Sequence, residues 1–244
     1  MLPKSLVLLA IVAGGFAVET TLGFGATVIA VSLGAFWFPL STLVPALVPV
    51  NLGLSLYIVL RYGGAIDRRL LLGRVVPFML AGLPLGLLAF RYAGEHWLKL
   101  VFGVLVVVLA VSQLLRMSRG GVVAALPPVA SGLLLFLAGV AHGAFSTGGP
   151  LAVYVAGRQL PDPAGFRSTL SALWLILGGV LVVGYLWTGA IGERSLSLSL
   201  VCAAGLAIGI LVGELLHRRL DRRVFTVLVH SLLLVAGALL AVRA

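Results

Sequence analysis

The sequence predicts an all-α integral membrane protein with two inverted repeats, each a broken-helix hairpin followed by three transmembrane helices. The first observation behind this prediction is the composition: of 244 residues, 61% are apolar and 10% are charged, and the mean hydropathy is +1.20. Soluble domains are roughly 45–50% apolar and about 25% charged. The second observation is a pair of unusually long, interrupted apolar segments, one in each half of the chain. The composition excludes a soluble enzyme, a disordered tail and a disulfide-stapled secreted module.

The chain is also basic, with 17 Lys and Arg against 7 Asp and Glu. In a membrane protein this excess marks cytoplasmic loops and anionic headgroups, so the expected partner is the lipid bilayer and not nucleic acid. Cys202 is the single cysteine and lies in an apolar run, which rules out a disulfide framework within the chain. The acids and histidines are scattered without metal-ligand spacing, and we predict no cofactor and no metal site.

Six apolar runs are typical of ordinary spanning helices, for which about 17–25 residues are needed. Four of them are long and carry no charge. The other two are shorter, and snorkelling cations at Arg74, Arg91 and Arg116 flank them. The six predicted spans are 40–60, 75–90, 97–115, 168–192, 195–213 and 224–242.

Two further apolar segments, 5–38 and 120–157, are too long for one helix and marginal for two full spans and a turn. Each has a break near its middle, at Glu19–Gly25 in the first and at His142–Pro150 in the second. Glycine pairs and hydroxyl side chains weaken a helix, and Pro150 lacks the N–H that a continuous helix needs. We therefore predict two hairpins, each made of two short helices that meet at a non-helical tip. Such backbone is tolerated at membrane depth only where protein or a wet cavity satisfies it.

A cleaved signal peptide is an alternative for the first segment, because Lys4 precedes an apolar run and small residues follow at Ala13–Gly15. The second half of the chain contains a matching interrupted segment. Cleavage would leave that segment without its counterpart, so the hairpin is the favoured interpretation.

An internal duplication is indicated by a constant offset of 125 residues. This shift lays Gly64–Ile66 on the identical Gly189–Ile191, just after the next span in each half, and it also superimposes the two interrupted segments. Scattered identities are weak evidence in a chain so rich in Leu, Val, Ala and Gly, but the tripeptide and the breaks share one offset. We predict a single transmembrane domain with repeat one at 1–117 and repeat two at 126–244.

The basic residues predict how the halves are oriented. If each interrupted segment returns to its starting side, twelve basic residues collect on one side and five on the other, whereas single crossings give nine against eight. The positive-inside rule therefore favours hairpins, with both termini outside the cytoplasm. Each half then makes an odd number of crossings, so the repeats are inverted, which is a layout of secondary transporters. The twelve residues are Arg61, Arg68, Arg69, Arg74, Arg116, Arg119, Arg158, Arg167, Arg218, Arg219, Arg222 and Arg223.

Three short motifs resemble those of a known protein family, and the resemblance covers nearly the whole chain. The motifs are the Gly23–Gly25 break, the run Gly143–Pro150 and the opening Phe166–Leu170 of the following span. Placed in a two-fold repeat, they resemble the TauE/SafE sulfite exporter family, also described as the toluene-sulfonate uptake permease family. The resemblance implies a multi-pass protein of a bacterial cytoplasmic membrane that moves sulfite, organosulfonates or related small anions.

The two tips are candidate anion sites. The first N–H groups of a helix have no intrahelical partners, and the helix dipole adds partial positive charge there, so an anion can bind without a full cation. In the second tip, Ser146 or Thr147 suits the N-cap and Pro150 the first helical position. The alternative is that the glycines only allow close helix packing. The candidate residues are Thr20, Thr21, Gly23 and Gly25 in the first tip and Ser146, Thr147, Gly148 and Gly149 in the second.

Two titratable residues accompany the tips. Glu19 lies well inside an apolar segment, where a charge costs on the order of 2.5–3.5 kcal/mol, so we predict a proton-coupling or gating carboxylate. Its alternative role is a structural cap of tip N–H groups. His142, in the corresponding region of the second segment, either carries a proton or donates to an oxyanion, or makes a structural hydrogen bond.

Two more polar residues are candidates for the solute pathway. Asn51 follows two prolines in a span and is a candidate for lining the pathway. Arg167 opens a span and either attracts anions at the cytoplasmic mouth or snorkels at a helix end.

Together these features favour a secondary transporter of small, sulfur-containing anions, driven by a proton or substrate gradient and compatible with a homo-oligomer. The chain has no glycine-rich P-loop for a primary pump. An anion channel using the same tips is the alternative, and an intramembrane enzyme is disfavoured because catalytic groups are not clustered. A purely structural subunit would leave the cost of Glu19 unexplained.

Overall fold

The computed structural model describes residues 3–119, 126–160, 162–217 and 222–244, and all regular structure in them is helical. Within this part of the chain, seven helical stretches are long and apolar enough to cross a membrane. Of the six predicted spans, five meet this standard, and the sixth forms a helix in which the described apolar stretch, Val229–Val242, is shorter. The six helices are α3 (Leu40–Tyr62), α5 (Val76–Tyr92), α6 (Glu95–Arg119), α9 (Pro163–Thr188), α10 (Glu193–His217) and α11 (Arg222–Val242).

Both interrupted segments are broken helices, as predicted. The first consists of α1 (Lys4–Leu22) and α2 (Ala26–Gly34), and the second of α7 (Pro128–Phe145) and α8 (Gly149–Ala156). The prediction of two short arms was wrong, because α1 has 19 residues and α7 has 18, whereas α2 has 9 and α8 has 8. Of these four arms, the two first ones, α1 and α7, are long enough to be candidate spans.

Each break has a local chemical cause. Gly23 and Gly25 have φ angles of 86° and 114°, in the left-handed region that favours glycine. Ser146 has φ 54° and, instead of capping α8 as predicted, ends α7 by donating its backbone N–H to the His142 carbonyl at 2.7 Å. The residue before α8 is Gly148, whose side chain offers no cap.

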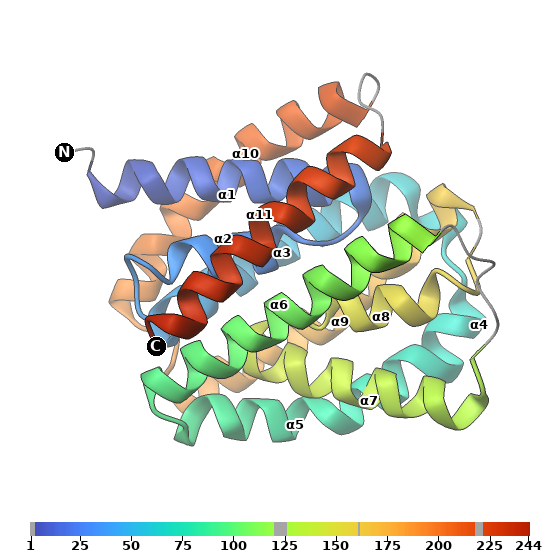
Figure 1. Ribbon diagram of the computed structural model, residues 1–244, viewed down its shortest axis with the longest axis horizontal. Coiled ribbons are helices and arrows are strands. Elements are labelled where there is room, and N and C mark those ends of the chain that lie inside the picture. The colour runs from blue at the N-terminus through green and yellow to red at the C-terminus, as the bar shows by residue number, and fades with distance from the viewer. Residues whose placement is uncertain (1–2, 120–125, 161, 218–221) are drawn as a thin grey trace.

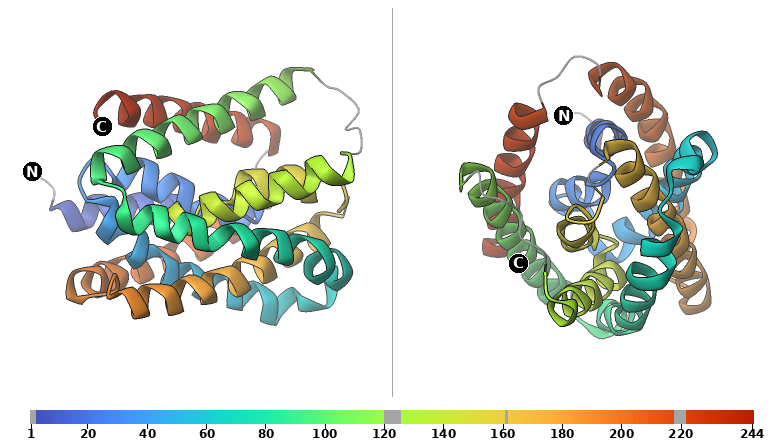
Figure 2. Two further views of the ribbon diagram at one scale, coloured as in Figure 1. Left: turned by 90° about the horizontal axis from the view of Figure 1, so that it is seen from below. Right: turned by 90° about the vertical axis from the view of Figure 1, so that its right-hand side faces the viewer.

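The chain reverses at each break. Gly25 lies against the Val18 side chain and Ala26 against Gly15, so α2 returns along α1, and Gly148 likewise lies against Ala138 of α7. The two hairpins enter from opposite ends of the bundle (Figure 1). The end-on view shows α2 and α8 inside a ring of longer helices, and nearly all of α2 is buried (Figure 2).

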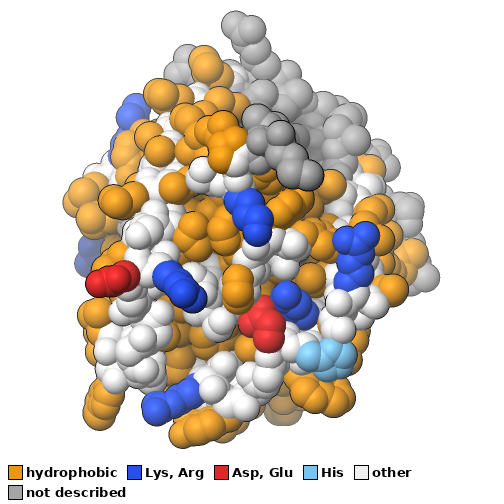
Figure 3. Space-filling model, turned by 90° about the vertical axis from the view of Figure 1, so that its left-hand side faces the viewer, with side chains coloured by type: hydrophobic (Ala, Val, Ile, Leu, Met, Phe, Trp, Pro, Cys, Tyr) orange, Lys and Arg blue, Asp and Glu red, His pale blue; other side chains and the backbone are white. Residues whose placement is uncertain are grey.

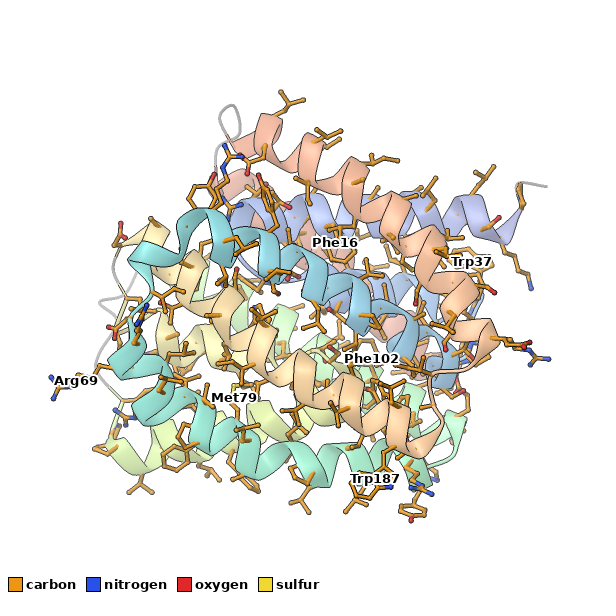
Figure 4. The ribbon with its side chains drawn as sticks, turned by 180° about the vertical axis from the view of Figure 1, so that it is seen from behind. Phe16, Trp37, Arg69, Met79, Phe102 and Trp187 are labelled. Carbon is orange, nitrogen blue, oxygen red and sulfur yellow. The ribbon has the colours of Figure 1, made fainter. Side chains whose placement is uncertain are left out.

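The bundle has two distinct ends. At one end α1 begins and α11 ends; at the other lie η1 (Gly63–Ala65), α4 (Arg68–Leu70) and the π-helical turn η2 (Leu71–Val75) (Figure 1). We call the latter the α4 end. Figure 3 shows the opposite end, where isolated charged side chains stand among apolar ones. Figure 4 places Trp37 and Trp187 at that end, away from Arg69.

The long arms of the hairpins pack closely on spanning helices. Helix α1 packs along α10, α7 along α5, α6 along α11 and α3 along α9. Glycines permit the closest approaches: a methyl group at Gly86 of α5 would lie 2.0 Å from the Val140 carbonyl oxygen of α7. The same arrangement recurs where Gly209 of α10 meets the Ala13 carbonyl of α1. Close packing of small residues is a usual source of helix association in membranes.

Candidate functional site

The two tips meet around a small cavity of about 20 Å³, which has room for one water-sized molecule. We call it the tip cavity. Its walls come from α1, α2, α3, α7, α8 and α9. The lining residues are Glu19, Phe24, Gly25, Thr27, Val28, Val48, Asn51, Leu52, His142, Ser146, Thr147, Gly149, Trp174 and Gly178.

At the first tip, a carboxylate of the protein already occupies the start of α2. The Glu19 side chain is only 3% exposed, and its Oε2 accepts a hydrogen bond from the backbone N–H of Ala26 at 2.8 Å. The Asn51 side chain also hydrogen-bonds the Glu19 carboxyl, and its Nδ2 donates to Thr27 Oγ1 at 3.0 Å. A negative group at a helix N-terminus is favourable, so the start of α2 is capped from within the protein.

The second tip is different because nothing of the kind caps α8. His142 and Thr147 are 4% and 3% exposed, yet both ring nitrogens of His142 and the Thr147 hydroxyl have no hydrogen-bond partner among the described residues. The two residues line the tip cavity beside Gly149 at the start of α8. Buried polar groups without partners cost about 1–3 kcal/mol each, and such groups in a native site call for a ligand or water.

One side chain of α9 touches both tips. The Trp174 ring stacks on the His142 ring with centroids 5.4 Å apart, and its Nε1 donates to the Gly23 carbonyl oxygen at 3.3 Å. Sequence reasoning missed Trp174. Its signal was a tryptophan deep within a span, since membrane tryptophans usually lie at the interfaces.

Thr20 and Thr21 lie outside the tip cavity as the described residues define it. Both face α10. The Thr21 hydroxyl donates to the carbonyl oxygens of Ala17 at 2.8 Å and Gly213 at 3.3 Å, and the Thr20 side chain packs against Gly213. Their observed contacts therefore hold α1 on α10.

The four predicted glycines also divide. Gly25 and Gly149 line the tip cavity, and a methyl group added at Gly149 would lie 3.7 Å from Phe24 Cβ. Gly23 packs against Arg167, and Gly148 lies so close to α7 that a methyl group there would be 2.3 Å from the Ala138 carbonyl oxygen. Gly23 therefore serves the turn of the first tip, and Gly148 serves the packing of the second tip on α7.

Arg167 lies near the first tip but not on the tip cavity. Its Nη2 forms an ion pair with Glu214 Oε1 of α10 at 3.4 Å, and its guanidinium lies 5.2 Å from the centre of the Tyr62 ring. The contact with Gly23 joins this pair to the tip backbone. Arg167 therefore links α9, α10 and the first hairpin.

A second and larger cavity of about 330 Å³ adjoins the tips. It shares Phe24, Gly25 and Val28 with the tip cavity, and its remaining wall is largely apolar. We call it the side cavity. The lining residues outside the shared wall are Val18, Val106, Val108, Leu109, Ala110, Ser112, Gln113, Leu134, Pro150, Leu151, Val153, Tyr154, Val229, His230 and Leu233.

Comparison with known proteins identifies the family to which the sequence is similar. The sequence matches the family described as Sulfite exporter TauE/SafE over residues 6–240, nearly the whole chain. No curated protein and no solved structure matches it. The family consists of multi-pass membrane transporters of sulfur anions, not enzymes. With its hydrophobic helices, two broken segments and a match of this length, the chain belongs to the TauE/SafE sulfite exporter family.

Proposed function

We propose that the protein is a secondary transporter that carries sulfite, an organosulfonate or a related sulfur oxyanion across the cytoplasmic membrane. The anion binds at the second tip, between the first amides of α8, the Thr147 hydroxyl and the His142 ring. The observation that carries this proposal is the uncapped start of α8 with two buried, unpartnered polar side chains beside it. An oxyanion would supply the acceptors that these groups lack.

The local chemistry supports an anion over a cation. The helix dipole of α8 places partial positive charge at its N-terminus. Gly149 has no side chain, which leaves the backbone open to close approach. The tip cavity has room for about one water, so the present conformation is closed around the site and a four-atom oxyanion requires the tips to move apart.

We propose that Glu19 couples anion binding to a proton. When ionised, the carboxylate accepts a strong hydrogen bond from the Ala26 N–H and repels an anion across the cavity; when protonated, it no longer repels the anion and its bond to Ala26 is weaker. His142 is the other titratable side chain on the tip cavity, on α7. On α9 and α10, Arg167 and Glu214 are paired with one another and do not line the tip cavity. Within the cavity, Glu19 is therefore the described carboxyl whose charge an entering anion meets.

The duplication and the inverted orientation are also part of the proposal, with repeats at 1–117 and 126–244. Equivalent elements would be α1 and α7, α2 and α8, α3 and α9, α5 and α10, and α6 and α11. Exchanging the halves turns the α1–α10 contact into the α7–α5 contact and leaves α3–α9 and α6–α11 unchanged, as a two-fold relation requires. Alternating access by movement of one repeat against the other follows from such symmetry.

The proposed orientation puts the α4 end in the cytoplasm and both termini outside. Arg68, Arg69 and Arg74 lie in α4 and η2 at that end, consistent with the positive-inside rule. Trp187 and Trp37, which are 89% and 44% exposed, would mark the outer interface. Arg218 and Arg219, which also enter the charge count, lie outside the described residues, as does the junction at Gly120.

The site is tested by removing one hydroxyl. Thr147→Val keeps the shape of the side chain and should lower the affinity for sulfite about 10- to 100-fold, since a hydrogen bond to a charged group contributes about 1.5–3 kcal/mol. Because the hydroxyl has no partner among the described residues, thermal stability should be unchanged or higher. Binding is measured by calorimetry on purified protein, and unfolding by a thermal melt.

The matched control is Thr21→Val. Its hydroxyl is hydrogen-bonded within the protein, so the variant should lose about 0.5–1.5 kcal/mol of stability and keep its sulfite affinity. Equal affinities for Thr147→Val and the unaltered protein would refute the site. In proteoliposomes, saturable flux driven by a gradient supports a transporter, whereas single-channel conductance would establish an anion channel.

A further inference from the structure

The side cavity has the size and chemistry of a ligand site. Its volume of about 330 Å³ falls within the usual range of roughly 300–1,000 Å³, and its wall is mostly Val, Leu and Ala from α6, α8 and α11. Polar side chains are few, and Ser112, one of them, donates its hydroxyl to the Leu109 carbonyl of its own helix. The cavity therefore suits an apolar group.

The side cavity adjoins the proposed anion site across a common wall. Phe24, Gly25 and Val28 line both cavities, and Pro150 follows Gly149 directly at the start of α8. Phe24 stands against the second tip, since a methyl group at Gly149 would lie 3.7 Å from its Cβ. Once the tips move apart to admit the acidic group, a ligand that reaches Thr147 can place its remaining atoms past Phe24.

We propose that the side cavity holds the apolar part of an organic oxyanion whose acidic group is bound at the second tip. This inference rests on the proposed function and narrows its substrate class. A hydrocarbon chain alone would fill the side cavity and leave His142 and Thr147 unpaired. An inorganic oxyanion would pair those groups and leave the side cavity empty. An organic oxyanion satisfies both parts of the site.

A series of ligands with increasing chain length tests whether the acidic group and the apolar part bind in these two places. Purified protein is titrated with sulfite, methanesulfonate, ethanesulfonate and butanesulfonate, and with 1-butanol as an apolar compound without an acidic group. Each methylene buried in the side cavity should raise affinity about fourfold, so butanesulfonate should bind about 60-fold more tightly than methanesulfonate. The alcohol should bind far more weakly than butanesulfonate.

Two variants fill the side cavity from two different helices. Ala110 of α6 is 1% exposed and lines the side cavity, and Val153 lines it from α8. Ala110→Phe and Val153→Phe should each abolish the gain from chain length and leave methanesulfonate affinity within about threefold. Val104→Phe is the matched control, because Val104 is 49% exposed on the same helix as Ala110 and should keep the full gain. Thermal melts show which variants are folded. One folded filling variant is enough for the test.

The remaining outcomes separate the possible failures. Equal affinity for methanesulfonate and butanesulfonate in the unaltered protein would overturn this inference and leave the anion site intact. Absence of binding by every anion would overturn the proposed function as well. If the filling variants instead lose lipid that copurifies with the unaltered protein, detected by mass spectrometry, and keep the chain-length gain, the side cavity holds an acyl chain and the inference is wrong.

Discussion

The Glu19 carboxylate sits where a dissolved anion would otherwise meet the start of α2. Its bond to the Ala26 N–H shows why a costly buried acid is stable there: the amide and Asn51 supply donors in place of water. The two predicted roles of Glu19, structural cap and proton carrier, are therefore compatible. As an ionised group it caps α2 strongly, and as a neutral group it holds that amide more weakly and no longer repels an anion.

Glu19→Gln separates these roles. The amide oxygen of Gln can still accept from Ala26, so the fold should persist, whereas no proton can be gained or lost. We expect anion exchange to continue and its dependence on pH, measured as tracer flux in proteoliposomes between pH 5 and 8, to disappear. Glu214→Gln, which alters a carboxyl paired with Arg167 away from the tip cavity, should retain it. A Glu19→Gln protein with the original pH profile would contradict proton coupling through this residue.

At the scale of elements, the long arms depend on glycine contacts with their spanning partners. Gly86→Ala would place a methyl group 2.0 Å from the Val140 carbonyl oxygen and 2.7 Å from the Ala144 nitrogen, so α5 and α7 must separate. Overpacking of this kind costs about 1–3 kcal/mol, and the melting temperature in detergent should fall.

The same substitution in open space provides the control. Gly179 lies inside α9, and a methyl group there meets nothing within 4 Å. Gly179→Ala should leave stability unchanged or raise it by up to about 1 kcal/mol, because alanine has the higher helix propensity. Similar melting temperatures for the two variants would show that the α5–α7 contact is less tight than described.

Local signals explain which elements the sequence predicts correctly. The breaks were predictable because Gly23, Gly25 and Pro150 act through their own backbone chemistry. The lengths of the arms were not predictable, because Gly14 and Gly15 also weaken an isolated helix. In the folded protein Gly15 packs against Ala26 of α2, and helix α1 continues through both glycines.

In the candidate site, too, local signals were predictable and long-range contacts were not. Glu19, His142 and Asn51 stand out as polar residues in apolar runs, and they line one cavity. The faces of Thr20 and Thr21 depend on α10, which is almost 200 residues away in the chain, and no local pattern indicates that contact. The same is true of Trp174, whose importance depends on two tips from different halves of the chain.

At the scale of the whole molecule, the proposed orientation gives a labelling prediction. Gly64 lies at the α4 end and Gly94 in the turn between α5 and α6, and a methyl group at either meets nothing within 4 Å. The single native cysteine, Cys202, is fully buried, so it should remain unlabelled. In intact cells, an impermeant maleimide should modify Gly94→Cys and not Gly64→Cys.

Permeabilised cells supply the control, since both cysteines should then react. Labelling of Gly64→Cys alone in intact cells would reverse the orientation. Labelling of both in intact cells would show that the two ends are not on opposite sides of the membrane, and the inverted-repeat arrangement would have to be given up.

The indole of Trp174 has a consequence for how the protein moves. The ring stacks on His142 of one hairpin and donates a hydrogen bond to the Gly23 carbonyl oxygen of the other, so one side chain bridges the two hairpins. A movement of either hairpin away from Trp174 breaks one of these two contacts. We therefore expect the two hairpins to be displaced together when the tip cavity opens to admit an anion.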